Sequence, residues 1–422
     1  MRILIIGGGI SGLATALSLK AAGFQPVVYE AVANPEPLGV GINLLPHAMR
    51  ELAELGLLEP LRETGVEIDE LVYLTKDGRD IWREPRGLAA GYRWPQIAIH
   101  RGELQMLLLR TVQARLGPDA VRFGHMLHDL ETSDRGVTAH FIDRASGRSL
   151  GSAQGKVLIA ADGIHSAVRR KFYLDEGIPK WNGVTLSRST TRMAAPPGGA
   201  RMIWAGHSRQ KFVAYPIRHD PRTGETLLNW ICDLKSGSTA TPPPEDWNRK
   251  GDRAALLSAY KGWRWEEIDV PAIIAASGDI YEFPMVDRDP LPRWTFGRTT
   301  LLGDAAHPMY PVGSNGATQG IIDARVIAFH LAGAPDVDTA LARYEDERRE
   351  ATSRIVLMNR AQGPDKVMDL AEERAPTKAH DLDAVLPHSE RADIAAGYKK
   401  AAGFDPASLN ARHSYSLKDW PA

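Results

Sequence analysis

Apolar and polar positions at the start of the chain predict a buried strand that runs into a helix. Residues 3–6 are apolar, the motif Gly7-x-Gly9-x-x-Gly12 follows, and apolar residues then continue at helical spacing through residue 19. A second apolar stretch, residues 26–29, ends at Glu30. In such a unit, backbone N–H groups and the helix dipole point at a pyrophosphate, and the acid after the second strand holds a ribose. The pattern therefore predicts dinucleotide binding.

The rest of the chain shows two kinds of pattern of apolar and polar residues. Helical patterns over residues 46–55, from 100–105 onward, and over 316–331, with buried strands at 121–123, 156–161 and 299–304, extend the nucleotide-binding unit. Strand patterns also occur at 71–81, which the polar loop 82–95 follows, and at 137–141. From residue 181 on, strand patterns at 184–193, 202–204, 211–217 and 227–234 are joined by polar loops and predict an antiparallel sheet. Pro242-Pro243-Pro244 indicates a linker before a helical stretch at 253–260.

These patterns predict an α/β fold in which a Rossmann-type domain is interrupted by a second, sheet-based domain. The first domain comprises residues 1–70, 98–180 and 280–360, and the antiparallel-sheet substrate domain comprises 71–97 and 181–279. Residues 361–422 are polar, contain Pro and Gly, and predict a C-terminal helical tail.

Composition narrows the function classes. The 422 residues include 51 basic and 52 acidic side chains, so no net charge attracts nucleic acid. The single cysteine, Cys232, excludes an internal disulfide and a redox pair, and its place in an apolar stretch predicts a packed strand residue. No apolar run is long enough to span a membrane, and the histidines are too scattered to hold a metal. We therefore expect a cytoplasmic protein without a metal site.

Two further motifs follow buried strands. In Asp162-Gly163-Ile164-His165-Ser166, an acid and a glycine lead into a helix that carries Arg169 and Arg170, which either pair with a phosphate or carboxylate or form a solvated face. In Asp304-Ala305-Ala306-His307-Pro308, a carboxylate stands at a strand end, and the stretch 313–317 then opens a helix whose N–H groups suit an electron-rich ring edge. His165 and His307 are either catalytic or structural.

Together the three ordered motifs resemble those of the single-component flavoprotein aromatic monooxygenases, the p-hydroxybenzoate hydroxylase-like family, over nearly all of residues 1–360. The resemblance implies an FAD-binding domain, NADH or NADPH as a transient co-substrate, and O₂. It implies hydroxylation of a small aromatic or heteroaromatic substrate, with or without a carboxylate, through a C4a-hydroperoxyflavin, by a monomer or homodimer. The alternatives are an FAD oxidase or dehydrogenase that makes no oxygenated product, and a flavin-binding scaffold.

The resemblance also implies roles for individual residues. The positions expected to bind FAD are Gly7, Gly9, Ile10, Ser11, Gly12, Glu30, Ala31, Gly41, Ile42, Arg101, Leu127, Asp162, Gly163, Asp304, Gly316 and Ala317. Pro311, Gly313 and Asn315 belong to the loop expected to face the flavin, where backbone N–H groups favour its anionic reduced form. Arg50 either contacts the cofactor or faces solvent.

The substrate site is expected on the second domain. Arg188 and Arg192 are either anchors for a substrate carboxylate or solvated strand arginines. Tyr215 and Tyr310 either line the pocket or take part in ordinary packing. Where a relative has Trp-Arg-Gly, this chain has Ser187-Arg188-Ser189, which implies a more open and more polar site.

Overall fold

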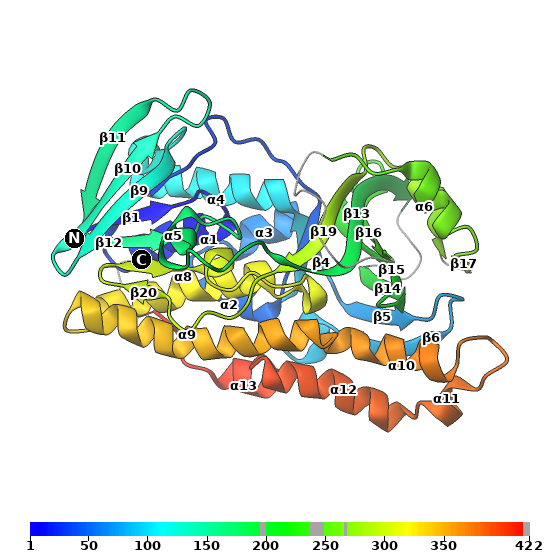
Figure 1. Ribbon diagram of the computed structural model, residues 1–422. Helices are drawn as coiled ribbons and strands as arrows, with labels where there is room; N and C mark the ends of the chain where they lie inside the picture. The colour runs from blue at the N-terminus through cyan, green and yellow to red at the C-terminus, as the bar shows by residue number, and fades with distance from the viewer. Residues whose placement is uncertain (195–199, 237–248, 266–267, 417–422) are drawn as a thin grey trace.

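The structure, a computed structural model, describes residues 1–194, 200–236, 249–265 and 268–416. It consists of two sheet-based lobes side by side, with long C-terminal helices running beneath both of them (Figure 1). The predicted linker at 242–244 lies outside the described residues.

The first lobe is built on a six-stranded sheet that is parallel except at one edge. Its order is β20-β21-β12-β1-β2-β8, and only β20 is antiparallel to its neighbour. Helix α1 (Ile10–Ala21) covers one face of the apolar strands, and three strands within residues 126–155 cover the other. Because both faces are buried, the strands read as continuous hydrophobic runs. The strands are β1 (Arg2–Ile6), β2 (Gln25–Tyr29), β8 (Val121–Arg122), β12 (Val157–Ala160), β20 (Thr295–Phe296) and β21 (Thr299–Leu301).

Helices and two small sheets complete this lobe. Helix α1 packs on both α8 and α4, and α2 packs on α8. The helices are α1 (Ile10–Ala21), α2 (Pro46–Glu54), α3 (Leu58–Thr64), α4 (Arg101–Leu116), α5 (Ala167–Phe172) and α8 (Gly316–Gly333). The small sheets have the orders β11-β10-β9 and β3-β7-β4, with strands β3 (Gly41–Leu44), β4 (Val66–Glu67), β7 (Ile97–His100), β9 (Met126–Ser133), β10 (Gly136–Ile142) and β11 (Ser149–Gly155).

The second lobe is a seven-stranded, mainly antiparallel sheet with the order β19-β13-β16-β15-β14-β5-β6. Its strands are β5 (Glu70–Leu74), β6 (Asp80–Pro85), β13 (Lys180–Ala194), β14 (Arg201–His207), β15 (Gln210–His219), β16 (Glu225–Lys235) and β19 (Tyr281–Asp287). Helices α6 (Arg253–Ala259) and α7 (Val270–Ala275) and the short pair β17 (Arg264–Trp265) and β18 (Ile268–Asp269) cover one face. Strand β19, from the segment 280–360 that was predicted for the first domain, pairs with this sheet. The positions of the domain boundaries stay a prediction.

The loop predicted over residues 82–95 is partly wrong, because its first residues extend β6. Charged side chains in this strand interrupt the alternation of apolar and polar residues by which strands are predicted. Glu84 is buried, yet it forms ion pairs with Arg86 and Lys399, the latter at 2.8 Å between Nζ and Oε2. A carboxylate buried with its own cations satisfies the strand without the apolar alternation that sequence patterns detect.

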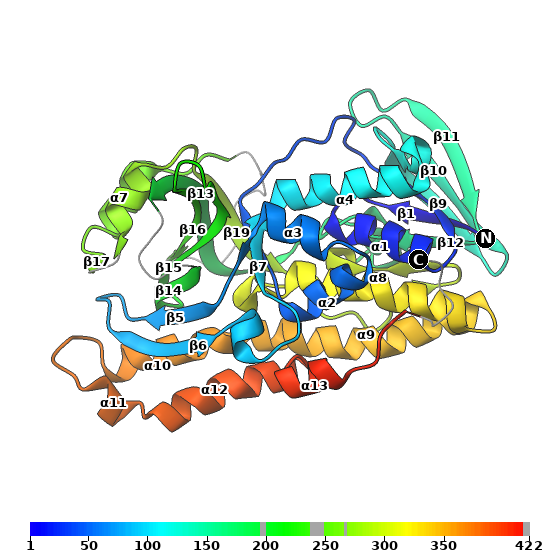
Figure 2. The same ribbon diagram turned by 180° about the vertical axis from the view of Figure 1, so that it is seen from behind.

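The C-terminal residues form the predicted helical tail. Helix α9 (Val337–Arg360) crosses beneath both lobes, and the later helices double back along it (Figures 1 and 2). They are α10 (Lys366–Arg374), α11 (Leu382–Val385), α12 (His388–Ala401) and α13 (Pro406–Ala411). Buried Lys211 of β15 ties the tail to the sheet: its ammonium contacts Asp365, at the start of the tail, and Asp233, the latter at 3.2 Å.

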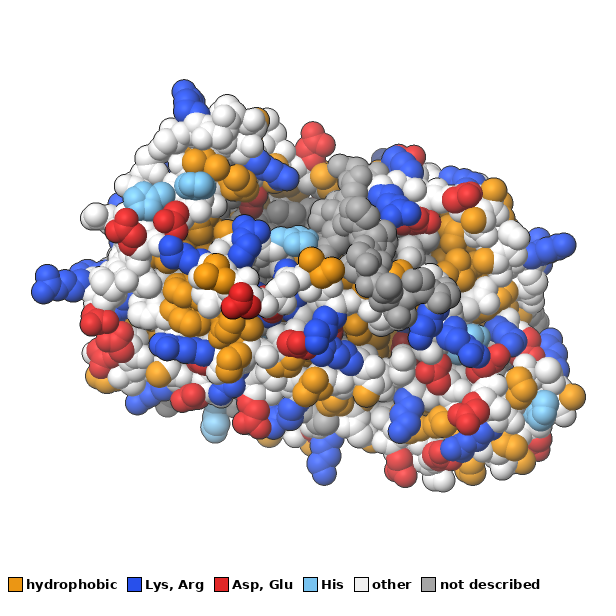
Figure 3. Space-filling model, in the orientation of Figure 1, with side chains coloured by type: hydrophobic (Ala, Val, Ile, Leu, Met, Phe, Trp, Pro, Cys, Tyr) orange, Lys and Arg blue, Asp and Glu red, His pale blue; other side chains and the backbone are white. Residues whose placement is uncertain are grey.

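Other predictions concern single residues and the surface. Cys232 is buried and unpaired in β16, as expected. Within the described ranges, no helix has the length and apolar character needed to cross a bilayer. Acidic and basic side chains are interspersed over the face seen in Figure 3, in keeping with a formal net charge of −1.

Replacing Lys211 with Met should destabilise the protein strongly. The change leaves Asp233 and Asp365 buried without their shared cation, and breaking a buried pair in this way costs about 3–5 kcal/mol. Urea unfolding should show this loss, whereas Lys76→Met, which breaks a half-exposed pair with Glu372, should cost no more than about 1 kcal/mol. Equal effects of the two changes would contradict the assignment of Lys211 as the buried clamp.

Candidate active site

The Gly-rich turn forms a tight connection between β1 and α1. Gly7 has φ +105°, in the left-handed region that favours glycine, and a Cβ on Gly12 would lie 1.9 Å from the Gly7 carbonyl oxygen. A Cβ on Gly9 would meet no atom within 4 Å. The turn is therefore closed on the side of the helix and open at Gly9, where a phosphate would approach the backbone.

Glu30 fixes the end of β2 against this turn. Its carboxylate accepts hydrogen bonds from the N–H groups of Gly8 (2.6 Å) and Val32 (2.7 Å). Both bonds lie at the carboxyl edge of the parallel sheet, which is where dinucleotides bind in folds of this kind. Ile10 and Ser11 begin α1 beside the turn, and Ala31 follows Glu30.

Asp162 stands at the same edge, directly after β12. One carboxylate oxygen accepts a hydrogen bond from the N–H of Ala167 at 2.8 Å, and the other, Oδ1, is buried without a partner among the described residues. Burial raises the pKa of this carboxyl. A buried acceptor without a donor is costly, so Oδ1 is suited to receive a hydrogen bond from a ligand hydroxyl.

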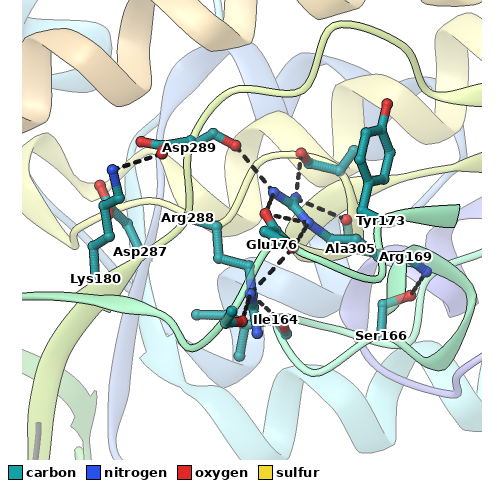
Figure 4. Close-up of polar contacts among 12 residues, drawn as sticks. Ile164, Ser166, Arg169, Tyr173, Glu176, Lys180, Asp287, Arg288, Asp289 and Ala305 are labelled. Carbon is teal, nitrogen blue, oxygen red and sulfur yellow. Dashed lines mark hydrogen bonds and ion pairs between the residues drawn. The ribbon is translucent and has the colours of Figure 1, made fainter. Parts of the chain in front are cut away.

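Arg169 is structural: it pairs with a carboxylate, as one of the two expected roles has it, but this carboxylate is that of Glu176 within the protein. Only 1% of it is exposed, and its guanidinium forms a fork with Glu176 and donates to the carbonyl oxygens of Ala305 (3.1 Å) and Ala306 (2.8 Å) (Figure 4). Arg288 also contacts Glu176, at 3.1 Å. Arg169 therefore joins the second motif to the third, and no donor of this fork is left for a phosphate.

The third motif places Asp304 beside the same edge. Asp304 is open on one side, but enough protein surrounds it for desolvation to raise the pKa of its carboxyl, against the charges of His307 and Arg101. His307 is buried, and its Nε2 lies 2.6 Å from Oδ2 of Asp323. Burial opposes ionisation of Asp323, but the charges of His307 and Arg348 outweigh it and lower its pKa to about 2. The structural interpretation of His307 is therefore favoured.

The loop predicted to face the flavin ends at the N-terminus of α8. Gly316 and Ala317 are the first residues of α8, and Gly313 has φ +72°. The Asn315 side chain points into the protein: Oδ1 lies 3.3 Å from Nε2 of His47, and Nδ2 donates to the hydroxyl of Tyr398 at 2.8 Å. The backbone of the loop, not the Asn315 amide, is therefore what remains available to a ligand.

The seven-stranded sheet presents its candidate residues on one face. Arg188 pairs in register with Ile231, and two residues along the sheet Asn229 pairs with Tyr215. Arg188 is half-buried, 5.9 Å from the Phe283 ring, and its Nε has no hydrogen-bond partner in the part of the chain that the structure describes. Burial lowers the pKa of Arg188 and raises that of Tyr215.

Asn229 was missed by the sequence interpretation, although it links the two lobes. Its Oδ1 accepts a hydrogen bond from the N–H of Gly41 at 2.7 Å, and its Nδ2 is buried without a partner among the described residues. The available signal was an amide on the strand face occupied otherwise by Leu227 and Ile231. Ile42, which follows Gly41, lies beside this contact.

Of the two remaining substrate-site candidates, Tyr310 packs near the sheet residues described above and Arg192 lies away from them. Tyr310 packs with Leu186 and Val312, and burial raises its pKa to about 12. Arg192, in contrast, is exposed and lies four residues from Arg188, about 13 Å along the strand.

Arg101 begins α4 and is exposed, and its charge acts on both Asp304 and Arg188, so it stands between the two candidate sites. Leu127 is buried in β9, and Gly163 and Pro311 lie in turns beside Asp162 and Gly313. Arg50 does not face solvent: it is buried over the Trp94 ring and donates to the Arg412 carbonyl oxygen.

Comparisons with known proteins identify the class. A family model described as an FAD binding domain matches residues 1–358, so the chain belongs to this family. Phenazine 1,6-dicarboxylic acid hydroxylase from Lysobacter antibioticus is 45% identical over 85% of this chain and 89% of that protein. A 3-amino-4-hydroxybenzoate 2-monooxygenase from Streptomyces platensis is 32% identical over 97% and 98%. The structure of an HpxO variant from Klebsiella pneumoniae complexed with FAD has a TM-score of 0.75 at 25% identity, covering 95% and 98%.

The predicted fold class and the predicted FAD-dependent aromatic monooxygenase are thereby confirmed, in preference to the oxidase alternative. The residues present fit FAD: open space at Gly9, the unpaired Oδ1 of Asp162 and the accessible carboxylate of Asp304 lie along one sheet edge. The roles assigned to individual residues stay predictions.

Alanine at Gly9 and at Gly12 should have different effects. Gly9→Ala should leave thermal unfolding of the FAD-free protein unchanged but weaken FAD binding about tenfold or more, because its Cβ enters only the space open to the phosphates. Gly12→Ala should lower the unfolding midpoint itself, since its Cβ displaces the Gly7 carbonyl, at a cost of about 1–3 kcal/mol. Fluorescence titration with FAD measures the affinities. Wild-type affinity in Gly9→Ala would contradict the phosphate assignment.

His47 should make the protein sensitive to acid. Its stack on Phe404, with ring centroids 4.7 Å apart, buries it, and burial with the nearby charge of Arg412 lowers its pKa from 6.5 to about 3. The unfolded chain therefore takes up a proton between pH 6.5 and 3 that the folded chain refuses, so stability is lost as pH falls, by up to about 1.4 kcal/mol per pH unit. In urea unfolding from pH 7 to 4, His47→Gln should show a shallower loss than the wild type. Parallel curves of stability against pH for the wild type and His47→Gln would contradict the role assigned to His47.

Proposed function

We propose that this monooxygenase hydroxylates an aromatic ring that bears a carboxylate, and that Arg188 anchors the carboxylate. The observation that carries the proposal is the half-buried guanidinium of Arg188, whose Nε is buried without a hydrogen-bond partner among the described residues. Burial lowers its pKa, which means that its charge is poorly solvated. An anionic substrate group stabilises such a charge and gains paired hydrogen bonds from it.

The neighbours of Arg188 suit an aromatic acid. The unpaired Nδ2 of Asn229 is a second donor on the same face, and the raised pKa of Tyr215 keeps its hydroxyl protonated and able to donate. Leu186, Ile231 and Val312 supply an apolar wall against which a flat ring can pack. A few placed polar groups within apolar walls are typical of small-molecule sites.

The names of relatives support the same class. They include a hydroxylase of phenazine 1,6-dicarboxylic acid and enzymes of 3-amino-4-hydroxybenzoate, 3-hydroxybenzoate and 6-hydroxynicotinate, each of which carries a carboxylate. The stretches 37–43, 100–106 and 281–292 also resemble those of 5-methylphenazine-1-carboxylate 1-monooxygenase. A heteroaromatic carboxylic acid of the phenazine type is therefore the substrate that these features support best.

The arrangement of the site indicates which part of the reaction depends on FAD and which part depends on the protein's residues. FAD, when bound, supplies the chemistry that passes electrons from NADH or NADPH to O₂ and one oxygen atom to the ring. Glu30, Asp162 and Asp304 would hold its hydroxyl groups, and the backbone N–H groups of residues 313–317 would face its ring. The sheet residues orient the substrate, and their apolar neighbours exclude water. We also propose that the protein is a cytoplasmic monomer or homodimer, with the domain boundaries predicted from its sequence.

Replacing Arg188 with Gln should separate charged from uncharged substrates. For an aromatic carboxylic acid, kcat/KM should fall about 100-fold or more, mainly through KM, because a charge-assisted pair at a buried site is worth about 2–5 kcal/mol. For the methyl ester of the same acid the change should stay within about threefold. Oxidation of NADH and NADPH, with mass detection of the hydroxylated product, measures both.

Arg192→Gln is the matched control, since Arg192 is an exposed arginine on the same strand and should leave both substrates unaffected. An equal loss for acid and ester in Arg188→Gln would contradict a carboxylate anchor. Substrate-independent oxidation that yields only H₂O₂ across a panel of aromatic acids would contradict the proposed activity itself.

A further inference from the structure

We propose that Tyr398, in helix α12 of the C-terminal tail, is a positioning residue that sets the conformation of the loop 311–316 facing the flavin. The tail is then part of the construction of the active site and not only a cover over the two lobes. The inference rests on the flavin-facing role proposed for this loop, and it is independent of which aromatic compound is the substrate.

The hydroxyl of Tyr398 lies between the loop and helix α9. It accepts a hydrogen bond from Nδ2 of Asn315 at 2.8 Å and donates to Oδ1 of Asn359 at 3.0 Å. Nδ2 of Asn315 also donates to the carbonyl oxygen of Gly313 at 3.2 Å, and Nδ2 of Asn359 donates to that of Tyr310 at 3.0 Å. One phenol thus connects the first and last parts of the loop through two amides.

The tyrosine ring also determines the backbone of the loop. A Cβ on Gly313 would lie 2.3 Å from the Tyr398 hydroxyl oxygen, and Gly313 adopts φ +72° against it. On the other side, a Cβ on Gly363 would lie 3.1 Å from Cε2 of the same ring. The ring is therefore held between two glycines, and the left-handed conformation at Gly313 is the one that leaves room for it.

This contact is buried, so its polar groups have no water to replace a lost partner. Tyr398 is 6% exposed, and Asn315 and Asn359 are 0% and 2% exposed. Burial raises the pKa of Tyr398, so its hydroxyl keeps the proton that it donates to Asn359. Buried donors and acceptors that lose their partner pay the full cost of desolvation, and the loop is then free to seek another arrangement.

The tail approaches the loop from a second side as well. Phe404, in the connection between α12 and α13, stacks on His47, whose Nε2 lies 3.3 Å from Oδ1 of Asn315. The Tyr92 hydroxyl holds the backbone of Phe404 at 2.7 Å. Both oxygen and nitrogen of the Asn315 amide are thus engaged by groups that the tail places, and Figures 1 and 2 show α12 running along α9 from the sheet lobe toward α13.

The test compares Tyr398→Phe with Tyr260→Phe in the full chain reconstituted with FAD. Tyr260 is also a buried tyrosine, and its hydroxyl shares its one proton between the carbonyl oxygens of Lys211 and Asp233, behind the sheet and away from the loop. Each variant loses one buried hydroxyl, so a purely structural effect should be similar in both. The readouts are the FAD dissociation constant, the visible spectrum of bound FAD and the thermal midpoint of the FAD-free protein.

For Tyr398→Phe we expect the FAD dissociation constant to rise about fivefold or more and the flavin absorption band to shift. We also expect a larger share of NADPH oxidation to end in H₂O₂ (NADPH + H⁺ + O₂ → NADP⁺ + H₂O₂). For Tyr260→Phe, FAD affinity should stay within twofold and the spectrum should be unchanged. Equal changes in both variants, or wild-type affinity and spectrum in Tyr398→Phe, would overturn the proposal.

If Tyr398→Phe does not fold, Asn359→Ala provides the second test. This change keeps the ring between the two glycines and removes the acceptor that orients its hydroxyl, so the flavin spectrum should shift in the same direction. An unchanged spectrum in Asn359→Ala overturns the proposal. Affinity and spectrum are measured without an aromatic substrate, so a failure of the Arg188 proposal leaves this result intact, and the reverse also holds.

Discussion

The buried guanidinium of Arg169 joins two chain segments, residues 161–170 and 302–308, that are more than 130 positions apart and together form the cofactor edge. Strands β12 and β21 are parallel neighbours, so their carboxyl ends meet at one edge of the sheet, and Arg169 then bonds across that edge to the carbonyl oxygens of Ala305 and Ala306. Its charge is neutralised by Glu176, which also pairs with Arg288. Because an unpaired charge at this depth costs several kcal/mol, about 3–5 when one partner is removed, the two segments have little freedom to separate.

The position of the proposed substrate site relative to the cofactor site depends on a few contacts between the two lobes. The amide of Asn229 reaches from the seven-stranded sheet to the backbone of Gly41 in the nucleotide-binding lobe. Arg101 lies close enough to Asp304 and to Arg188 for its charge to act on both. A ring anchored at Arg188, as proposed, would in this way be set against the edge where the flavin is proposed to lie, which is the orientation that ring hydroxylation needs.

The tail adds a third layer to this arrangement. Lys211 ties its beginning to the substrate sheet, Arg412 near its end contacts Glu51 of α2, and Tyr398 between them meets the loop 311–316. The same polypeptide segment therefore contacts both lobes and the loop 311–316. Under the role proposed for Tyr398, a change in how the tail packs would alter cofactor binding, although none of these tail residues stands at the carboxyl edge of the parallel sheet.

Local pattern by itself determined much of this protein. The Gly-rich turn, the acid at Glu30, the buried strands and the long helices follow from hydrophobic periodicity and glycine spacing, which act over a few residues. Only the tertiary structure decided the partners of Arg169, the exposure of Arg192 as against Arg188, the inward turn of the Asn315 amide and the contacts of Tyr398. Each depends on which distant groups are brought within hydrogen-bond distance, and a charged or polar residue that finds its partner 100 or more positions away leaves no periodic signal in the sequence.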